Sequence, residues 1–185
     1  MKSISMLIAV AASLALPVLA LAALIGEQEY RVLDARILRV PVRGVDPRDL
    51  LQGHYIAATL DWDWQAEPAS SGDGGLCVLP PAGVVRPRVR FVEGWKPASG
   101  PIEGCRMMIA GKARAKQEGL APAFVPADLD AGYYNLHLFV SESRAPELDE
   151  LIRKRPDALT IDLAVRPDGS AAVRRLLLDG KPLDR

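Results

Sequence analysis

The chain has 185 residues, of which 49% are hydrophobic and 25% are charged. Lysine plus arginine number 23, as do aspartate plus glutamate, so the formal net charge at pH 7 is +0. A chain of this length can bury one sizeable core, and its neutral charge supplies no electrostatic attraction to nucleic acid. These totals predict one compact domain and argue against a nucleic-acid partner.

The N-terminal segment is long and apolar. No charged residue occurs from Ile4 to Ile25, and a helix of that length would span about 33 Å, close to the hydrocarbon thickness of a bilayer. Lys2 precedes the segment, whereas Glu27 and Glu29 follow it, and this charge order favours a cytoplasmic N-terminus. We therefore expect the rest of the chain to lie outside the cytoplasm.

Two interpretations of residues 1–25 remain open. Their length suits a retained anchor that crosses the inner (cytoplasmic) membrane once. Ala20-Leu21-Ala22 is instead a small-x-small site of the kind that signal peptidases cut, and cleavage there would release the protein into the periplasm. Both interpretations predict a single extracytoplasmic domain over residues 26–185.

The chain has two cysteines, Cys77 and Cys105. In an exported domain an even number of cysteines is more typical of a disulfide than of a metal site or a catalytic thiol. Two free cysteines, buried as small apolar groups, are the alternative. The predicted compartment favours the disulfide.

Beyond Tyr30 the dominant hydrophobic period is two, which is typical of β-strands. Between His54 and Trp64, apolar residues alternate with a polar face that includes Asp61 and Asp63. Weaker runs predict further strands over residues 32–42, 84–92, 106–115 and 134–140. Because Gly-, Pro- and Ser-rich segments separate these short runs, we expect most of the sheet to be antiparallel.

The clearest hairpin lies near the C-terminus. Residues 159–165 alternate between apolar and polar, residues 167–170 (Pro-Asp-Gly-Ser) have turn composition, and residues 171–178 supply the partner strand. By contrast, residues 67–75 predict a flexible loop with nothing to bury, and residues 116–134 predict a long connection.

One short amphipathic helix is predicted over residues 146–156. Its acidic residues come early and its basic residues late, which complements the helix dipole, and a proline ends it. Leu148, Leu151 and Ile152 form a single apolar stripe that would lie across the sheet. The predicted fold class is therefore mainly β (α+β), with an N-terminal hydrophobic helix followed by an antiparallel β-rich domain.

The chain has no recognisable reaction motif. It contains no Gly-x-Ser-x-Gly, no His-Glu-x-x-His and no glycine-rich phosphate loop. Asp128 and Asp130 lack the glycine and the bidentate glutamate of an EF-hand. The sequence thus predicts no catalytic residue, no metal and no cofactor.

A proline-started turn precedes the first strong strand. Asp46 can cap it, Pro47 fits the first helical position, and Gly53 can end it at a positive φ. A capped turn is one interpretation. The alternative is an envelope hydrolase in which Asp46 or Asp49 orients His54 as an acid or base.

Three segments, taken in order, resemble the bacterial membrane-anchored GDYXXLXY family. They are Val45-Asp46-Pro47-Arg48-Asp49-Leu50-Leu51-Gln52-Gly53-His54-Tyr55, then Phe139-Val140-Ser141-Glu142, and finally Pro167-Asp168-Gly169 with Leu177-Leu178-Asp179-Gly180-Lys181. Of the five residues that name the family, Gly53 and Tyr55 are present. His54, Ala58 and Leu60 stand in place of the aspartate, the leucine and the second tyrosine.

The resemblance implies an exported, membrane-anchored domain that works beside a polytopic membrane protein or another envelope partner, and it implies no reaction. We therefore expect a binding or accessory component of an envelope complex rather than an enzyme. The candidate partner- or ligand-binding residues are Asp46, Pro47, Arg48, Asp49, Gly53, His54, Tyr55 and Glu142.

Overall fold

The structure is a computed structural model that describes most of the chain. The described residues are 15–26, 34–44, 55–80, 86–129, 134–139, 148, 150, 154–155 and 158–183. The chain divides into two compact units, Met1–Ala35 and Arg36–Arg185.

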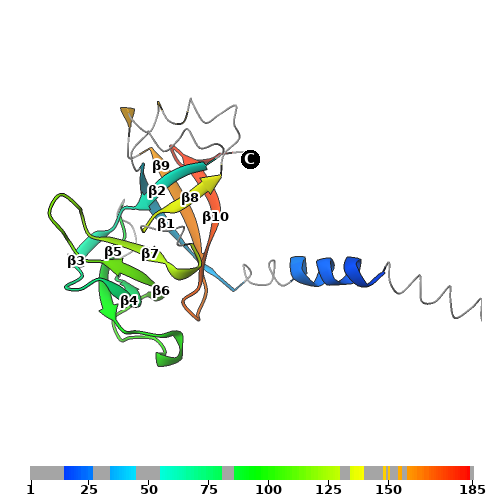
Figure 1. The fold of residues 1–185 in the computed structure, drawn as a ribbon, viewed down its shortest axis with the longest axis horizontal. Coiled ribbons are helices and arrows are strands. Elements are labelled where there is room, and N and C mark those ends of the chain that lie inside the picture. Colours follow the sequence, from blue (N-terminus) through cyan, green and yellow to red (C-terminus); the bar gives the residue numbers. More distant parts are fainter. Residues whose placement is uncertain are drawn as a thin grey trace, which may run out of the picture. The chain divides into compact units, whose positions relative to one another are not determined.

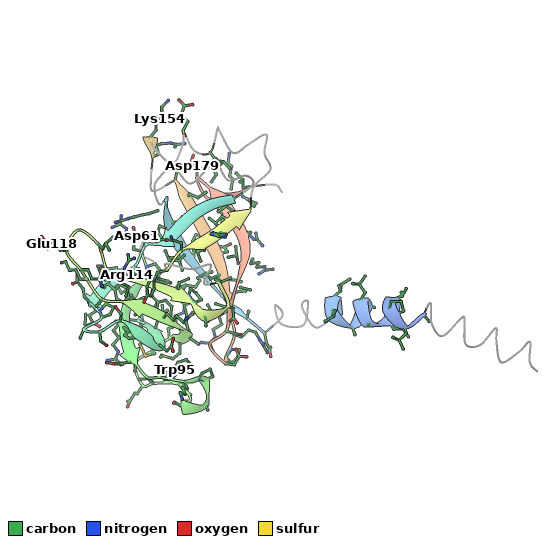
Figure 2. All side chains as sticks on the ribbon, in the orientation of Figure 1. Asp61, Trp95, Arg114, Glu118, Lys154 and Asp179 are labelled. Atoms are coloured by element: carbon green, nitrogen blue, oxygen red, sulfur yellow. A yellow bond between two sulfur atoms is a disulfide. The ribbon has the colours of Figure 1, made fainter. Side chains whose placement is uncertain are left out.

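In the first unit, residues 15–26 form a helix (Figure 1). All of its side chains are exposed, and Figure 2 shows only carbon atoms in them. The large apolar side chains, 56–70% exposed, are Leu16, Val18, Leu19, Leu21, Leu24 and Ile25. Among the described residues, no helix combines the length and the apolar content required to cross a bilayer.

The second unit contains a six-stranded antiparallel sheet in the order β11-β10-β9-β1-β2-β8. Its strands are β1 (Arg36–Gly44), β2 (Tyr55–Leu60), β8 (Leu136–Phe139), β9 (Leu159–Val165), β10 (Ala171–Leu178) and β11 (Lys181–Pro182). Strand β1 pairs with β9 as far as Pro41 and with β2 from Val42 onward. The change of partner thus falls at a residue that has no backbone N–H to donate.

A second sheet has five strands in the order β3-β5-β4-β6-β7. They are β3 (Asp63–Ala66), β4 (Gly72–Val78), β5 (Arg88–Glu93), β6 (Met107–Arg114) and β7 (Ala123–Pro126). The β3–β5 pair is parallel and the other pairs are antiparallel. Two 3₁₀ turns, η2 (Pro97–Ser99) and η3 (Ala127–Leu129), lie in the connections. The predicted mainly-β, largely antiparallel fold is confirmed.

The two sheets share one hydrophobic core. Val40 and Ile161 of the first sheet belong to the same buried cluster as Ile109 of the second. Trp62, just after β2, donates its indole N–H to the Phe124 carbonyl of β7 at 3.2 Å, and the two rings meet edge to face with centroids 6.3 Å apart. This contact buries an aromatic side chain without leaving its polar atom unpaired.

The predicted loop over residues 67–75 is wrong from Gly72 onward, because β4 begins there and lies in the middle of the second sheet. Gly75 is buried beneath Trp95. A Cβ added at Gly75 would lie 2.5 Å from the Trp95 ring and 2.7 Å from the Met108 methyl group. Glycine is required here by close packing and not by flexibility, a distinction that composition alone does not make.

Residues 116–134 contain more structure than a plain connection, because β7 and η3 lie within them. The Asp128 carboxylate accepts the Ala171 N–H at 3.2 Å, so it fixes the start of β10. The predicted hairpin of β9 and β10 is confirmed. Of the predicted helix over residues 146–156, Leu148, Glu150 and Lys154 are helical, and most of the remainder lies outside the described residues.

The predicted disulfide is confirmed. Cys77 and Cys105 are bonded, with Cα atoms 5.4 Å apart and a separation of 28 positions in sequence. The bond joins the C-terminal end of β4 to the segment before β6. Because disulfides persist in oxidising compartments and are rare in the cytosol, this bond indicates an extracytoplasmic location.

Replacing both cysteines by alanine should lower the free energy of unfolding by about 3–4 kcal/mol, because a closed loop of this length restricts the unfolded chain. Urea denaturation of the full chain in detergent, followed by circular dichroism, measures the change. Reduction of the unmodified protein by dithiothreitol should reproduce the loss. A difference below about 1 kcal/mol in both experiments would contradict the expectation.

Candidate functional site

Most of the sequence-predicted site lies outside the described residues. This holds for Asp46, Pro47, Arg48, Asp49, Gly53, His54 and Glu142, and Tyr55 is described only by its backbone at the start of β2. The binding role of these residues, and the hydrolase built on His54, therefore remain predictions.

The strand that follows the turn is described, and its inward residues are structural. Ala58 is fully buried and Leu60 is 6% exposed, both in the shared core. These are two of the five positions from which the GDYXXLXY family, which the sequence resembles, takes its name. Their burial between β1 and β8 explains why an apolar residue occupies each of them.

Asp61 departs from the predicted polar, solvent-facing side of its strand. It is only 7% exposed, and its carboxylate lies 3.1 Å from Arg43 and 2.7 Å from Arg86. Its backbone N–H also donates to the Pro41 carbonyl at 2.9 Å. A buried carboxylate needs such partners, so Asp61 ties β1 to the segment before β5 and is not free for chemistry.

Asp162 of β9 has the same arrangement. The strand register places it opposite Arg39 of β1 and opposite Arg175 of β10. Arg39 donates two hydrogen bonds to the carboxylate, at 2.8 and 3.2 Å, and Arg175 lies 3.7 Å away. The hydrogen bond to Asp162 raises the pKa of the Arg39 guanidinium above its ordinary value. Asp162 therefore links β9 to β1 through Arg39 and to β10 through Arg175.

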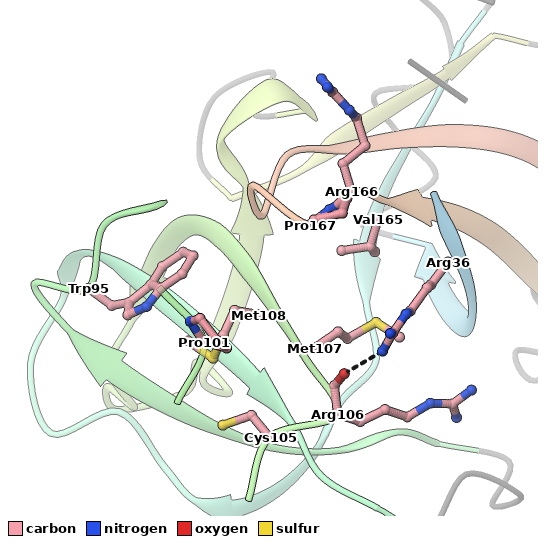
Figure 3. A pocket seen from close by; sticks show the side chains of 10 residues that line it. All are labelled: Arg36, Trp95, Pro101, Cys105, Arg106, Met107, Met108, Val165, Arg166 and Pro167. Atoms are coloured by element: carbon pink, nitrogen blue, oxygen red, sulfur yellow. Dashed lines mark hydrogen bonds between the residues drawn. The ribbon is translucent and has the colours of Figure 1, made fainter. Parts of the chain in front are cut away.

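A cavity of about 270 Å³ lies between the two sheets, and we call it the intersheet cavity. Figure 3 shows Trp95, Pro101 and Met108 on one side and Met107, Val165 and Arg36 on the other. The complete lining is Arg36, Trp95, Pro101, Cys105, Arg106, Met107, Met108, Val165, Arg166 and Pro167. Most of these side chains are apolar, as is common for cavities that bind small molecules.

One wall of the cavity depends on the turn between β9 and β10, residues 167–170, which we call the docking turn. The Gly169 carbonyl accepts the N–H of Ala110 in β6 at 2.8 Å. Gly169 has φ +83°, and a Cβ there would lie 2.9 Å from the Trp95 ring. Trp95 is held in turn by its indole N–H, which donates to the Gly100 carbonyl at 2.9 Å. The hydrogen bond to Ala110 and the contact with Trp95 therefore join the first sheet to the second beside the cavity.

Three arginines surround the cavity. Arg36 donates to the Arg106 carbonyl at 3.1 Å, and this bond is drawn in Figure 3. Arg166 lies 3.3 Å from the Asp168 carboxylate, and its buried Nε has no hydrogen-bond partner within the described part of the chain. Figure 3 shows the side chains of Arg106 and Arg166 extending away from Trp95, Pro101 and Met108.

Asp168 is itself held within the docking turn. Ser170 donates its hydroxyl at 2.6 Å and its backbone N–H at 3.0 Å to the carboxylate. These hydrogen bonds, aided by the charge of Arg166 and opposed by partial burial, lower the pKa of Asp168 below its ordinary value. The charged carboxylate thus stabilises the turn that closes the cavity.

Sequence reasoning did not find the intersheet cavity. Its residues come from β1, from the segment 95–106, from β6 and from the end of β9, and no motif links them. The available signals were a tryptophan directly after Gly94 at the end of β5 and a turn glycine, Gly169. In the described residues, no group of three or more His, Cys, Asp or Glu side chains is placed to hold a metal ion.

The fold and its disulfide define a β-rich extracytoplasmic domain preceded by an exposed apolar helix. The family model described as GDYXXLXY protein matches residues 17–176. The chain therefore belongs to the GDYXXLXY family. No curated protein and no solved structure matches the sequence.

Gly169→Ala should destabilise the domain more than Gly180→Ala. Both positions have positive φ, +83° and +78°, so both substitutions cause backbone strain, but only Gly169 faces the Trp95 ring and open space surrounds Gly180. We expect an additional loss of about 1–3 kcal/mol at Gly169 from overpacking. Urea denaturation of the two variants measures it, and equal losses would contradict the docking contact.

Asp168 should make stability depend on pH in the acid range. Because its pKa is lowered in the folded state, the stabilisation is present above the unfolded pKa, near 4, and is lost as the pH falls through the folded pKa. Asp168→Asn should therefore show a smaller loss of stability between pH 7 and pH 2. The side chain is 49% exposed, so we expect a difference below about 1 kcal/mol.

Denaturation of both proteins across this pH range provides the test. Ser170→Ala, which removes only the hydroxyl donor, should give an intermediate result. Identical pH profiles for Asp168→Asn and the unmodified protein would refute the assignment.

Proposed function

We propose that the protein is a membrane-anchored, extracytoplasmic binding domain that acts as an accessory component of an envelope complex. The observation that carries the proposal is the fully exposed apolar helix over residues 15–26, joined in one chain to a domain with a disulfide. A helix that is apolar on all sides requires an apolar environment.

The energy available from burying this helix is large. Six large apolar side chains of the helix are more than half exposed, and each contributes about 1.5–3 kcal/mol when it is removed from water. Their transfer into lipid would therefore supply about 9–18 kcal/mol. This is of the same order as the whole stability of a typical small domain, so burial of the helix in a membrane is strongly favoured over its exposure to water.

The binding role rests on the intersheet cavity and on the absence of any recognisable reaction motif in the sequence. The two most buried carboxylates in the part of the chain that the structure describes, Asp61 and Asp162, are each held by arginines. By contrast, the lining of the cavity is mostly apolar and includes three arginines. Cavities that combine apolar walls with a few polar or charged groups commonly bind small molecules.

Membrane fractionation tests the anchor. The full chain, expressed in a bacterial host, should stay in the membrane after an alkaline carbonate wash and should be degraded by protease added to spheroplasts. Leu19→Arg with Leu21→Arg should release it, because each arginine costs about 2.5–3.5 kcal/mol in a membrane helix. Leu19→Ala with Leu21→Ala is the matched control and should stay in the membrane.

Extraction of the unmodified chain by carbonate, or protection from external protease, would contradict the proposal. The mass of the mature protein adds a separate readout. A mature N-terminus directly after Ala22 would replace the anchor by a cleaved signal peptide and leave the extracytoplasmic location intact.

The accessory role calls for a partner in the same membrane. Crosslinking in native membranes followed by mass spectrometry should join the protein to a polytopic membrane protein. Asp46→Ala with Arg48→Ala should weaken the crosslink, whereas Arg174→Ala, an exposed change in β10, should not. Full retention of the crosslink by the Asp46 and Arg48 variant would exclude the turn as the contact surface.

A further inference from the structure

The face of the first sheet that points away from the shared core has a pattern of its own. Leu38 of β1 and Leu163 of β9 are buried in that core, so the residues that alternate with them lie on the opposite face, which we call the outer face. The strand register forms two rows there across β1, β9 and β10 (Figure 1). One row is Ile37, Ala164 and Ala172, and the next is Arg39, Asp162 and Arg175.

The second row presents cations to solvent and buries its anion. Arg39 and Arg175 share the Asp162 carboxylate; their side chains are 53% and 44% exposed, whereas that of Asp162 is 6% exposed. A bulge between Val173 and Arg175 adds Arg174 beside this row. Arg174 is exposed and has no ion pair with another described residue. Solvent therefore meets three guanidinium groups, and the single carboxylate lies beneath them.

The first row is apolar and partly exposed. Ile37 is 37% exposed, and Ala172 is also exposed. Helices that bind to membrane surfaces combine the same two elements, namely apolar side chains that enter the headgroup region and basic side chains that meet anionic lipid. The outer face carries this combination on neighbouring rows of a sheet.

The covalent chain limits the distance between this face and the apolar helix. The helix ends at Gly26, and β1 begins at Arg36, one residue before Ile37. The chain from Gly26 to Arg36 extends at most about 36 Å. When the helix is anchored in a bilayer, the start of β1 stays within this distance of it. Lipid is therefore the partner with the highest effective concentration at the outer face.

We propose that the outer face of β1, β9 and β10 docks on anionic phospholipid of the membrane that holds the helix. Arg39, Arg174 and Arg175 contact lipid phosphates, and Ile37 enters the headgroup region. This inference rests on the proposed membrane anchor and adds a second contact between the protein and the membrane. Docking would turn the first sheet toward the lipid and leave the second sheet, which packs on the other face, accessible from the extracytoplasmic space.

Energy transfer from tryptophan to dansyl-labelled lipid measures docking in the full chain. Trp62, Trp64 and Trp95 are the three tryptophans, and all belong to the second unit, so their emission reports the distance of the domain from the bilayer. The chain is reconstituted in nanodiscs of phosphatidylcholine, with or without phosphatidylglycerol. We expect stronger transfer when phosphatidylglycerol is present, and loss of the difference at about 0.5 M salt, which screens exposed charges.

Arginine variants locate the contact. Arg174→Gln, which leaves Asp162 paired, should lower the ratio of docked to undocked domain about fivefold, the contribution of one arginine near an anionic membrane surface. Arg88→Gln is the matched control. Arg88 is exposed on β5 beside Val89, and Val89 is buried in the shared core, so Arg88 lies on the side of the second sheet that faces away from the first. This variant should dock as the unmodified protein does.

Equal transfer in the two lipid mixtures, or equal transfer by the Arg174→Gln and Arg88→Gln variants, would overturn the proposal. Arg174→Gln with Arg175→Gln separates lipid from a protein partner. Loss of its crosslink to a membrane protein, with energy transfer unchanged, would assign the outer face to that protein and overturn lipid docking. Retention of the chain in nanodiscs during size-exclusion chromatography reports on the anchor alone. A chain that is not retained contradicts the anchor and the docking together, whereas a retained chain without composition-dependent transfer contradicts only the docking.

Discussion

The docking turn joins the two sheets through a hydrogen bond and an aromatic contact. The Ala110 N–H reaches the Gly169 carbonyl, and the absence of a side chain at Gly169 lets the Trp95 ring approach closely. Trp95 in turn requires Gly75 beneath it. One tryptophan that lines the cavity therefore packs closely against two glycines, one in β4 and one in the docking turn.

The strands with clear alternation were predictable from the sequence, and those defined by close packing were not. The β9–β10 hairpin combines a period of two with a turn that has both proline and glycine, so its signal is local. Strand β4 opens with glycines that composition assigns to a loop, although Phe91 covers Gly74 and Trp95 covers Gly75. Strand β7 has four residues, too few to establish a period.

The arginines discussed above include two groups, those that contact a buried aspartate and those that line the cavity. Arg39, Arg43 and Arg86 hold Asp61 or Asp162 within the fold. Strand register pairs Arg39 with Asp162, whereas Asp61 meets its two arginines just after the end of β2. Arg36 and Arg106 face no carboxylate among the described residues and border an apolar cavity. The candidate site was not predictable because it combines four separate segments, whereas the sequence-predicted turn derived from one continuous segment.

Amide hydrogen exchange at Ala110 tests the central claim most directly, since this N–H bonds to the docking turn and not to a neighbouring strand. In the full chain the Ala110 amide should exchange as slowly as the ladder amides of β4 and β6, because both open only with the core. In Gly169→Ala it should exchange faster while the β4 amides remain protected. An Ala110 amide that exchanges at the rate of an unstructured peptide in the unmodified protein would contradict the joined sheets and the cavity between them.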